Sequence, residues 1–373
     1  MSSALEPPRA IAARFAIQGE IGSIAPHSGG HINDSYRVAF LNADIAKRCF
    51  LQRINRAAFP DAGAVMENLL RITQHIAAKL QRANVTDWRR RVLTPIPTRD
   101  GGFAITDAAG DTWRMFEFIE NTHVHLSART PEQSEQAGLA FGEFQYVLSD
   151  LPPPPLRETI PGFHDTPARY AALDAAIDYA RGHAQLSQRL NEARPELAFA
   201  AAHRKLGGRL IELLHSGVVP QRVAHNDAKL SNVLLDEQTG DALCVTDLDL
   251  VMPGTVLFDF GDMLRSMISP AAEDEAELAR VAITTPLFTG LTRGYLAATR
   301  DFLTPAERDH LVTSGLVITL EQGVRFLTDF LRGDAYYKTS RPGQNLDRAR
   351  VQFRLVHQIS NHRDELERIA RSL

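Results

Sequence analysis

The residues best suited to do chemistry lie between Arg222 and Asp262. Here His225-Asn-Asp227 is followed five residues later by Asn232, and Asp247 follows the second of two apolar runs. The spacing from Asp227 to Asn232 is typical of a phosphoryl-transfer loop, in which a carboxylate accepts the proton of an attacking hydroxyl and an amide oxygen binds a metal ion. A second carboxylate must hold that metal from the other side. We therefore predict Asp227 as the catalytic base, and Asn232 and Asp247 as Mg²⁺ ligands.

Neighbouring polar residues could assist this chemistry or only support the loop. Lys229 could neutralise the transferring phosphoryl group, or it could form a surface ion pair. Asp249 is the predicted helper of Asp247 at the metal. Asp259 begins an Asp-Phe-Gly sequence that spells a kinase metal motif, but it lies far along the chain. We expect Asp259 to bond backbone groups of the loop or to cap a helix, and His225 to stabilise the loop.

The elements that position these residues are predicted from apolar runs and turn residues. Val233–Leu235 and Leu243–Val245 are strand-like, and Thr239-Gly240-Asp241 between them has turn chemistry. The sequence therefore predicts a hairpin that is entered from the loop His225–Asn232 and leads to Asp247.

Two glycines near the N-terminus are candidates to cover phosphates. Gly29 and Gly30 lie between the strand-like runs Ile17–Ile24 and Arg37–Phe40. Glycines let backbone N–H groups approach phosphate oxygens without a side chain in between. The same pair is also typical of an ordinary turn.

The strand that follows, Cys49–Asn55, lacks the lysine that binds phosphates at this position in kinases. Period-two alternation puts Gln52 on one face and Arg53 on the other. Gln52 could donate a hydrogen bond to a phosphate, and Arg53 could supply charge if the register is shifted. Both could instead be surface residues of the strand.

The rest of the N-terminal third is predicted to contain the helix Val65–Gln81 and the strands Leu93–Pro97, Gly102–Thr106 and Trp113–Phe118. Backbone groups from Glu117 to Ile119 would pair with adenine if this segment is a hinge, and an edge strand is the alternative. The later segments predicted to be helical are Pro131–Leu148, Pro167–Arg194, Leu197–Ser216, Glu273–Ala282, Leu287–Ala298, Pro305–Gly333 and Arg348–Leu373.

Composition narrows the function classes. A chain of 373 residues suits two or three domains or one large two-lobed enzyme. Its formal charge of -4 argues against nucleic acid as a partner, because no basic excess is available to neutralise phosphates. Cys49 and Cys244 lie in apolar runs and are predicted to be buried free thiols of a cytoplasmic protein. No apolar run long enough to span a bilayer is present, so we expect no membrane association.

These motifs, in this order, resemble the aminoglycoside phosphotransferase and choline kinase group of small-molecule kinases, and most closely the N-acetylhexosamine 1-kinases. The resemblance covers nearly the whole chain. It is carried by Gly30-His-Ile-Asn, Phe50-Leu-Gln-Arg-Ile-Asn, Phe163-His-Asp-Thr-Pro, His225-Asn-Asp-Ala-Lys-Leu-Ser-Asn, Asp247-Leu-Asp-Leu-Val-Met-Pro-Gly, Phe258-Asp-Phe-Gly-Asp and Arg325-Phe-Leu-Thr-Asp-Phe-Leu-Arg-Gly-Asp-Ala-Tyr.

The resemblance implies an α+β, two-lobed protein-kinase-like fold with a small β-rich N-terminal lobe (1–116), a hinge (117–121) and a large, mostly helical C-terminal lobe (122–373). It implies ATP and Mg²⁺ as cofactors and a monomer or weak dimer. The implied reaction is phosphorylation of the anomeric hydroxyl of an N-acetylhexosamine. His31, Arg325 and Tyr336 would contact the sugar.

Each of these three residues also has a plainer interpretation. Arg325 could form a helix-surface ion pair, Tyr336 could be a core residue, and His31 could be a turn residue. Two other functions stay open: a kinase of another small alcohol, such as choline, homoserine, an amino sugar or an antibiotic, and an inactive nucleotide-binding module. Most of those alcohols are cations, so a positive Arg325 in the acceptor pocket would argue against them.

Overall fold

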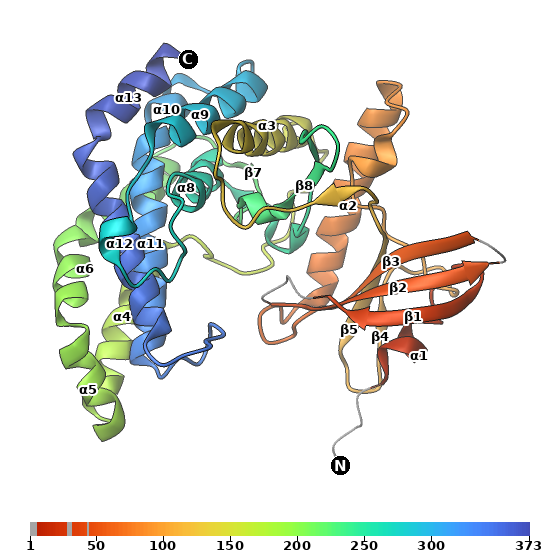
Figure 1. The fold of residues 1–373 in the computed structure, drawn as a ribbon, viewed down its shortest axis with the longest axis horizontal. Coiled ribbons are helices and arrows are strands. Elements are labelled where there is room, and N and C mark those ends of the chain that lie inside the picture. Colours follow the sequence, from red (N-terminus) through yellow and green to blue (C-terminus); the bar gives the residue numbers. More distant parts are fainter. Residues whose placement is uncertain (1–5, 28–31, 43–44) are drawn as a thin grey trace.

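The protein has a β-rich N-terminal region and a larger helical C-terminal region (Figure 1). The structure is a computed structural model that describes residues 6–27, 32–42 and 45–373. The expected α+β, two-lobed architecture is confirmed. The division at 116 and 121 stays a prediction.

The N-terminal region is an antiparallel sheet with the strand order β1-β2-β3-β5-β4. Its strands are β1 (Glu20–Pro26), β2 (Asp34–Asn42), β3 (Ile45–Arg53), β5 (Thr112–Glu117) and β4 (Ile105–Thr106). Alternation along the strands sends one set of side chains, including Leu51 and Met115, onto α1 (Pro8–Ala12). The other set, including Phe50 and Phe116, faces α2 (Ala62–Arg82) and the C-terminal region.

The predicted strand Leu93–Pro97 is not a regular strand. It makes single contacts with β5, where the Ile96 N–H donates to the Met115 carbonyl at 2.8 Å and Pro95 bridges Phe116. Pro95 and Pro97 lack the N–H groups that a continuous ladder needs, which explains the short pairing.

The predicted hairpin is confirmed as β8 (Val233–Asp236) and β9 (Ala242–Val245). On its other side β8 pairs with β6 (Thr122–His123). A second pair, β7 (Arg222–Ala224) with β10 (Met252–Gly254), flanks the segment that carries the predicted site residues. These short strands fix both ends of that segment.

Helices make up the rest of the C-terminal region. They are α3 (Pro131–Leu148), α4 (Thr166–Arg181), α5 (Ala184–Glu192), α6 (Arg194–Gly207), α7 (Arg209–His215), α8 (Val256–Met267), α9 (Thr285–Thr299), α10 (Pro305–Asp309), α11 (Leu311–Leu331), α12 (Gln344–Asn361) and α13 (Arg363–Ser372). The largest hydrophobic core surrounds α11, which packs against α4, α6, α8 and α12.

Two glycines allow α3 and α9 to approach closely. A Cβ on Gly138 would lie 2.2 Å from the Leu291 carbonyl oxygen, and one on Gly294 would lie 2.1 Å from the Glu135 carbonyl oxygen. Neither position can accept a side chain without separating the helices. This packing holds α3 beside the segment 222–262, so that its Gln145 reaches the site described below.

The predicted helix Glu273–Ala282 is wrong, because only a short 3-10 turn forms there, at Leu278–Arg280. Like charges four residues apart, such as Glu273 and Glu277, disfavour a helix. Glu273 instead forms an ion pair with Arg265. The two predicted helices up to 216 are each interrupted, near Gly182 and at Gly208.

The two cysteines, Cys49 and Cys244, are free and buried, as predicted. No helix within residues 6–27, 32–42 and 45–373 has both the length and the apolar character needed to cross a bilayer.

Candidate active site

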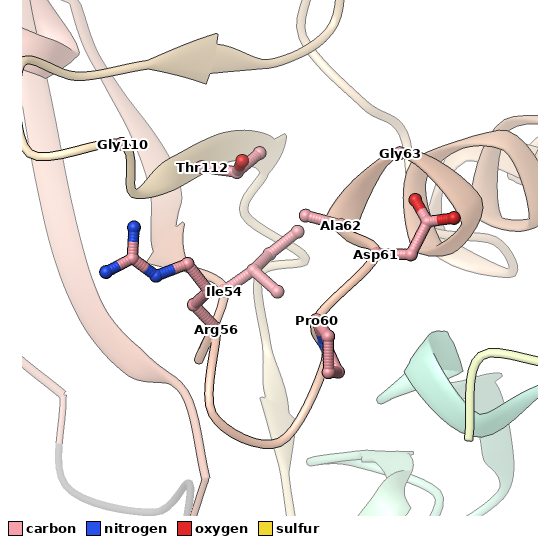
Figure 2. A pocket seen from close by; sticks show the side chains of 8 residues that line it. All are labelled: Ile54, Arg56, Pro60, Asp61, Ala62, Gly63, Gly110 and Thr112. Atoms are coloured by element: carbon pink, nitrogen blue, oxygen red, sulfur yellow. The ribbon is translucent and has the colours of Figure 1, made fainter. Parts of the chain in front are cut away.

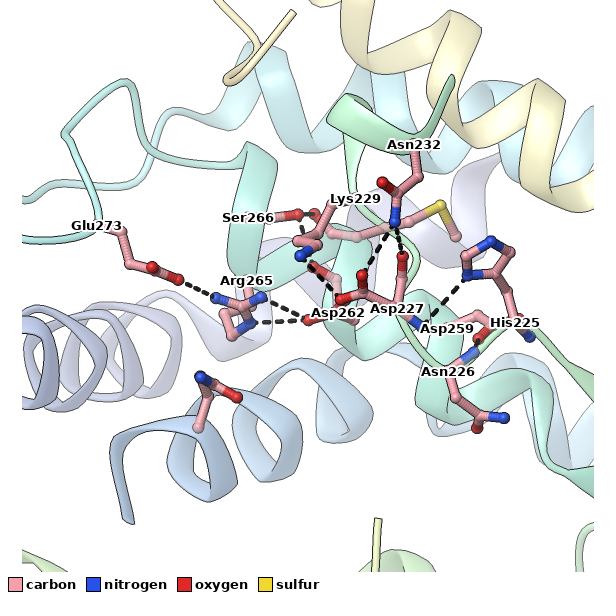
Figure 3. Close-up of polar contacts among 12 residues, drawn as sticks. His225, Asn226, Asp227, Lys229, Asn232, Asp259, Asp262, Arg265, Ser266 and Glu273 are labelled. Carbon is pink, nitrogen blue, oxygen red and sulfur yellow. Dashed lines mark hydrogen bonds and ion pairs between the residues drawn. The ribbon is translucent and has the colours of Figure 1, made fainter. Parts of the chain in front are cut away.

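The loop between β7 and β8 is held in place by Asp259, which lies in the first turn of α8 (Figure 3). The Asp259 carboxylate accepts hydrogen bonds from the backbone N–H groups of His225 at 2.8 Å and Asn226 at 2.7 Å, and from Gln145 at 2.6 Å. Burial raises the pKa of Asp259, and these donors partly offset that effect. The expectation that Asp259 bonds the loop backbone is confirmed.

His225 is a structural residue of the loop, as predicted. Its Nε2 lies 2.9 Å from the Thr246 carbonyl oxygen, and its Nδ1 accepts from the Asp227 N–H at 3.3 Å. These contacts assign the tautomer with the proton on Nε2. The ring packs edge-on against Phe141 and Phe144 of α3, so it is not available as a base.

Asp227, Lys229 and Asn232 lie together on this loop (Figure 3). Lys229 Nζ is 2.9 Å from Asp227 Oδ1, and Asn232 Nδ2 donates to Asp227 Oδ2 at 3.0 Å and to its carbonyl oxygen at 2.8 Å. Burial opposes the charged form of Asp227, but Lys229, His225 and Asn232 together outweigh burial and lower the pKa of Asp227. Asp227 is therefore an ionised acceptor at neutral pH.

Asp247 has the properties of a metal ligand. Its backbone is left-handed, with φ of 57°, a conformation that is uncommon for non-glycine residues and that Asp tolerates better than most. Its side chain reaches solvent and makes no ion pair or hydrogen bond with the described residues. Partial removal of this carboxylate from water, and then the negative charges of Asp249 and Asp227, raise the pKa of Asp247 to about 6. A divalent cation would relieve this repulsion.

Asn232 is the other predicted ligand. Because its Nδ2 donates to Asp227, its amide oxygen points away from that residue and is free to coordinate a cation. In the described part of the chain, no three His, Cys, Asp or Glu side chains are arranged so that they could hold a metal ion by themselves. One carboxylate and one amide oxygen still suit Mg²⁺, which keeps several waters and takes its remaining ligands from substrate phosphates.

Asp249 is engaged elsewhere. Both its oxygens lie in a buried polar cluster, with Oδ1 2.6 Å from Nη1 of Arg114 and Oδ2 accepting from Asn33 Nδ2 at 2.7 Å. Its role as metal helper stays a prediction. Arg114, on β5, was missed by sequence reasoning because its partners are distant in the chain and come together only in the folded sheet.

The structure separates Gln52 from Arg53. Gln52 faces the C-terminal region, where its amide oxygen accepts from Arg114 Nε at 3.2 Å and Nη2 at 3.0 Å. Arg53 lies on the opposite face and forms ion pairs with Asp34 and Asp111. The shifted register that would have turned Arg53 towards a phosphate is therefore absent.

Two of the three backbone N–H groups in the predicted hinge, Glu117–Ile119, already donate hydrogen bonds within the protein. The Glu117 N–H donates to the Thr94 carbonyl at 2.9 Å and the Phe118 N–H to the Arg48 carbonyl at 3.2 Å. Among the described residues, Ile119 N–H has no such acceptor, so it is the group of this segment best placed to meet an adenine. The Glu117 carboxylate pairs with Lys47 at 2.7 Å.

A pocket of about 410 Å³ opens beside Asp227. Arg325 and Tyr336 line it, as the resemblance implied, and so does Tyr337, which was not singled out from the sequence. The Arg325 guanidinium lies 4.8 Å from the centre of the Phe163 ring and donates to Gln322 at 3.1 Å. Gly29, Gly30 and His31 lie outside the described residues.

A buried pair forms one wall of this pocket. His164 Nδ1 is 2.8 Å from Glu321 Oε1, and His164 Nε2 is 3.1 Å from the Asn226 carbonyl oxygen. Both ring nitrogens therefore face oxygen atoms inside the protein. Thr166 donates to the other oxygen of Glu321 at 2.6 Å. The pair links α11, which carries Arg325, to the residue before Asp227.

Figure 2 shows another pocket, of about 290 Å³, between the start of α2 and the turn before β5. None of the predicted site residues that the structure describes lines it. Its lining residues are Ile54, Arg56, Pro60, Asp61, Ala62, Gly63, Gly110 and Thr112. The pocket beside Asp227, which is lined by the predicted base and by Lys229, is therefore the candidate active site.

Comparison with known proteins identifies the family of the chain and relates its fold to solved structures. A family model described as "Phosphotransferase enzyme family" matches residues 23–293. The fold is similar to that of a microcompartment-associated aminopropanol kinase (TM-score 0.64, 16% identity, 96% of this chain and 97% of the other). It is also similar to an aminoglycoside phosphotransferase from Alicyclobacillus acidocaldarius (0.59, 15%, 98% and 98%) and to a spectinomycin phosphotransferase in complex with ADP and spectinomycin (0.53, 12%, 91% and 94%).

Proposed function

This chain belongs to the phosphotransferase enzyme family, and on that premise we propose that it is a kinase that transfers the γ-phosphoryl group of ATP to the anomeric hydroxyl of an N-acetylhexosamine. The observation that carries the reaction class is the loop in which Asp227, Lys229 and Asn232 meet. The finer choice of acceptor rests on the charges in the pocket beside that loop.

Asp227 is the proposed base. Phosphoryl transfer requires little covalent work from the protein, so positioning and charge stabilisation carry most of the catalysis. The ionised carboxylate of Asp227 orients the acceptor hydroxyl and takes its proton as the bond to phosphorus forms. Lys229, at 2.9 Å from Asp227, keeps that carboxylate ionised and offers a positive charge to the phosphoryl group.

Asn232 and Asp247 are the proposed Mg²⁺ ligands. Magnesium would neutralise charge on the nucleotide phosphates. The free amide oxygen of Asn232 and the unpaired carboxylate of Asp247 support this role. Asp249 is better assigned to its contacts with Arg114 and Asn33.

The nucleotide is proposed to lie between the two regions, with its adenine at the segment from Glu117 to Ile119. The Ile119 N–H is the donor we assign to adenine, because those of Glu117 and Phe118 already donate within the sheet. Gly29 and Gly30 would cover the phosphates.

The charge balance of the pocket favours a neutral acceptor. Four carboxylates line it, and each has a basic partner within 4.0 Å: Asp227 with Lys229, Asp262 with Arg265, Glu273 with Arg265 and Arg348, and Glu321 with His164. Arg325 donates to Gln322, faces aromatic rings and has no carboxylate within 4.0 Å among the described residues, although the charges of Glu321 and Asp227 act on it from further away. A cationic acceptor would meet this unpaired guanidinium.

Arg325 and the aromatic residues fit a sugar better. A guanidinium can donate two hydrogen bonds to neighbouring oxygens or to an acetamide carbonyl. Tyr337 and Tyr336 offer flat faces against which a pyranose can pack. His31 is the proposed further contact to the sugar.

A second candidate is a kinase of a small amino alcohol. It is favoured by Glu273, a pocket carboxylate whose side chain is about half exposed and so could meet an ammonium group. A coupled ADP-release screen across hexoses, N-acetylhexosamines and amino alcohols decides between the two. Release with N-acetylhexosamines alone supports the sugar kinase, and release with amino alcohols alone supports the second candidate.

A further inference from the structure

The site-facing side of the sheet carries a buried cation that the sequence pattern did not indicate. In the antiparallel register, Gln52 of β3 is the direct partner of Arg114 of β5. Cross-strand partners point to the same face, so Arg114 occupies the place next to the missing lysine. Its side chain is 3% exposed.

The contacts of Arg114 hold it in position without using all of its donors. Nε and Nη2 donate to the Gln52 amide oxygen. Nη1 lies 2.6 Å from Asp249 Oδ1 in a buried ion pair. A guanidinium carries five N–H donors. One N–H of Nη1 and one of Nη2 therefore have no acceptor among the described residues and can donate to a ligand.

The neighbours of the Arg114 guanidinium are close in the chain to residues that we expect to lie near the nucleotide phosphates. Asp249, the ion-pair partner of Arg114, lies two residues after Asp247. The other oxygen of Asp249 accepts from Asn33, which follows Gly30 by three residues. The Arg114–Asp249 pair therefore connects the sheet to Asn33 and to the segment that contains Asp247.

We propose that Arg114 binds the phosphates of the nucleotide, supplying from β5 the charge that a β3 lysine would supply. Gln52 is then a positioning residue that holds the guanidinium through its amide oxygen, and Asp249 neutralises Arg114 until phosphate oxygens reach it. This inference rests on the proposed ATP-dependent function.

Other cations of the sheet fit this role less well. Arg53 lies on the opposite face with Asp34 and Asp111. Arg48 pairs with Glu120. Arg37 shares the site-facing side but is exposed and lies opposite Phe50, one strand further from Asp249 than β3.

Nucleotide binding without acceptor or metal tests the proposal. Dissociation constants for adenosine, ADP and ATP are measured by calorimetry in EDTA for the wild type and for Arg114→Gln, Arg114→Lys, Arg37→Gln and the opposite-face control Arg53→Gln. Arg114→Gln should weaken ADP and ATP binding by about ten- to hundredfold, the value of a hydrogen bond to a charged group, and leave adenosine unchanged. Arg114→Lys should keep most of the preference for ADP over adenosine, and Arg53→Gln should bind as wild type.

Three results would overturn the assignment: wild-type ADP affinity in Arg114→Gln, equal losses for ADP and adenosine, or a selective ADP loss in Arg37→Gln instead. If Arg114→Gln does not fold, the double variant Gln52→Lys/Arg114→Gln, which returns the cation to β3, should fold and prefer ADP. Failure of that variant to fold would assign Arg114 to the fold alone. If the wild type binds neither ADP nor ATP, the proposed function fails rather than the placement of the charge.

Discussion

Asp247 and Asp259 are both acidic residues of the segment after the catalytic loop, yet their environments predict opposite consequences of substitution. The Asp259 carboxylate accepts three buried hydrogen bonds. Asp247 accepts none from the described residues and sits in a left-handed backbone conformation. Asp259→Ala should therefore damage stability, whereas Asp247→Asn should damage metal-dependent binding.

The magnitudes follow from the contacts. Asp259→Ala leaves three buried N–H donors without an acceptor, at about 1–3 kcal/mol each. Release of a buried charge offsets part of that loss, so we expect a net destabilisation of about 3–5 kcal/mol. Asp247→Asn removes repulsion from Asp249 and Asp227 and keeps a residue that tolerates a positive φ. Its free energy of unfolding should change by less than about 0.5 kcal/mol or should rise.

Urea unfolding followed by circular dichroism measures the first quantity, and Mg²⁺ titration of ATP binding measures the second. We expect Asp247→Asn to lose the metal dependence while its unfolding midpoint stays at or above that of the wild type. The reasoning is refuted if Asp259→Ala is as stable as the wild type but loses the Mg²⁺ response, or if Asp247→Asn loses stability and keeps that response.

Further substitutions test the base, the acceptor contact and the buried pair. Asp227→Asn should lower turnover by about 10²–10⁴-fold with nucleotide affinity unchanged, and steady-state rates within tenfold of wild type would remove Asp227 from that role. Arg325→Ala should raise KM for N-acetylhexosamines and flatten their preference over plain hexoses, because the lost hydrogen bond is worth about 1–3 kcal/mol; an unchanged preference in initial rates would contradict the contact. Glu321→Gln should cost about 3–5 kcal/mol at pH 7, because it breaks a buried pair. Burial raises the pKa of Glu321, but His164, Arg325 and Thr166 together outweigh burial and hold that pKa below its ordinary value. The stability that ionised Glu321 contributes is thus present above about pH 4.3 and is lost as the pH falls through the pKa of Glu321 in the folded protein. Melting temperatures of variant and wild type should therefore converge in acid and diverge towards neutrality.

The parts predicted correctly from the sequence depend on short-range patterns. The spacing of Asp227 and Asn232 lies within one loop, and the hairpin after it is set by two apolar runs and a turn. Both were read from neighbouring residues and both are present. The bounds of α3 were likewise predicted to the residue, because Thr130 caps its start and Pro131 fits its first turn.

The parts that were missed depend on pairing between distant segments. Arg114 meets Gln52 only because β3 and β5 align in a particular register, and it meets Asp249 only because the sheet rests on the C-terminal region. No pattern local to Arg114 distinguishes it from a strand-surface residue. The contacts of Asp249 with Arg114 and Asn33 were missed for the same reason, since its neighbours in the chain do not reveal them.

The most direct test of the proposed function is proton-coupled ³¹P NMR of the product formed from ATP, Mg²⁺ and an N-acetylhexosamine. The proposal predicts a phosphate whose signal couples to the anomeric proton, with Asp227→Asn forming none of it. A 6-phosphate, or a protein that phosphorylates an amino alcohol and leaves the sugars unreacted, would contradict it.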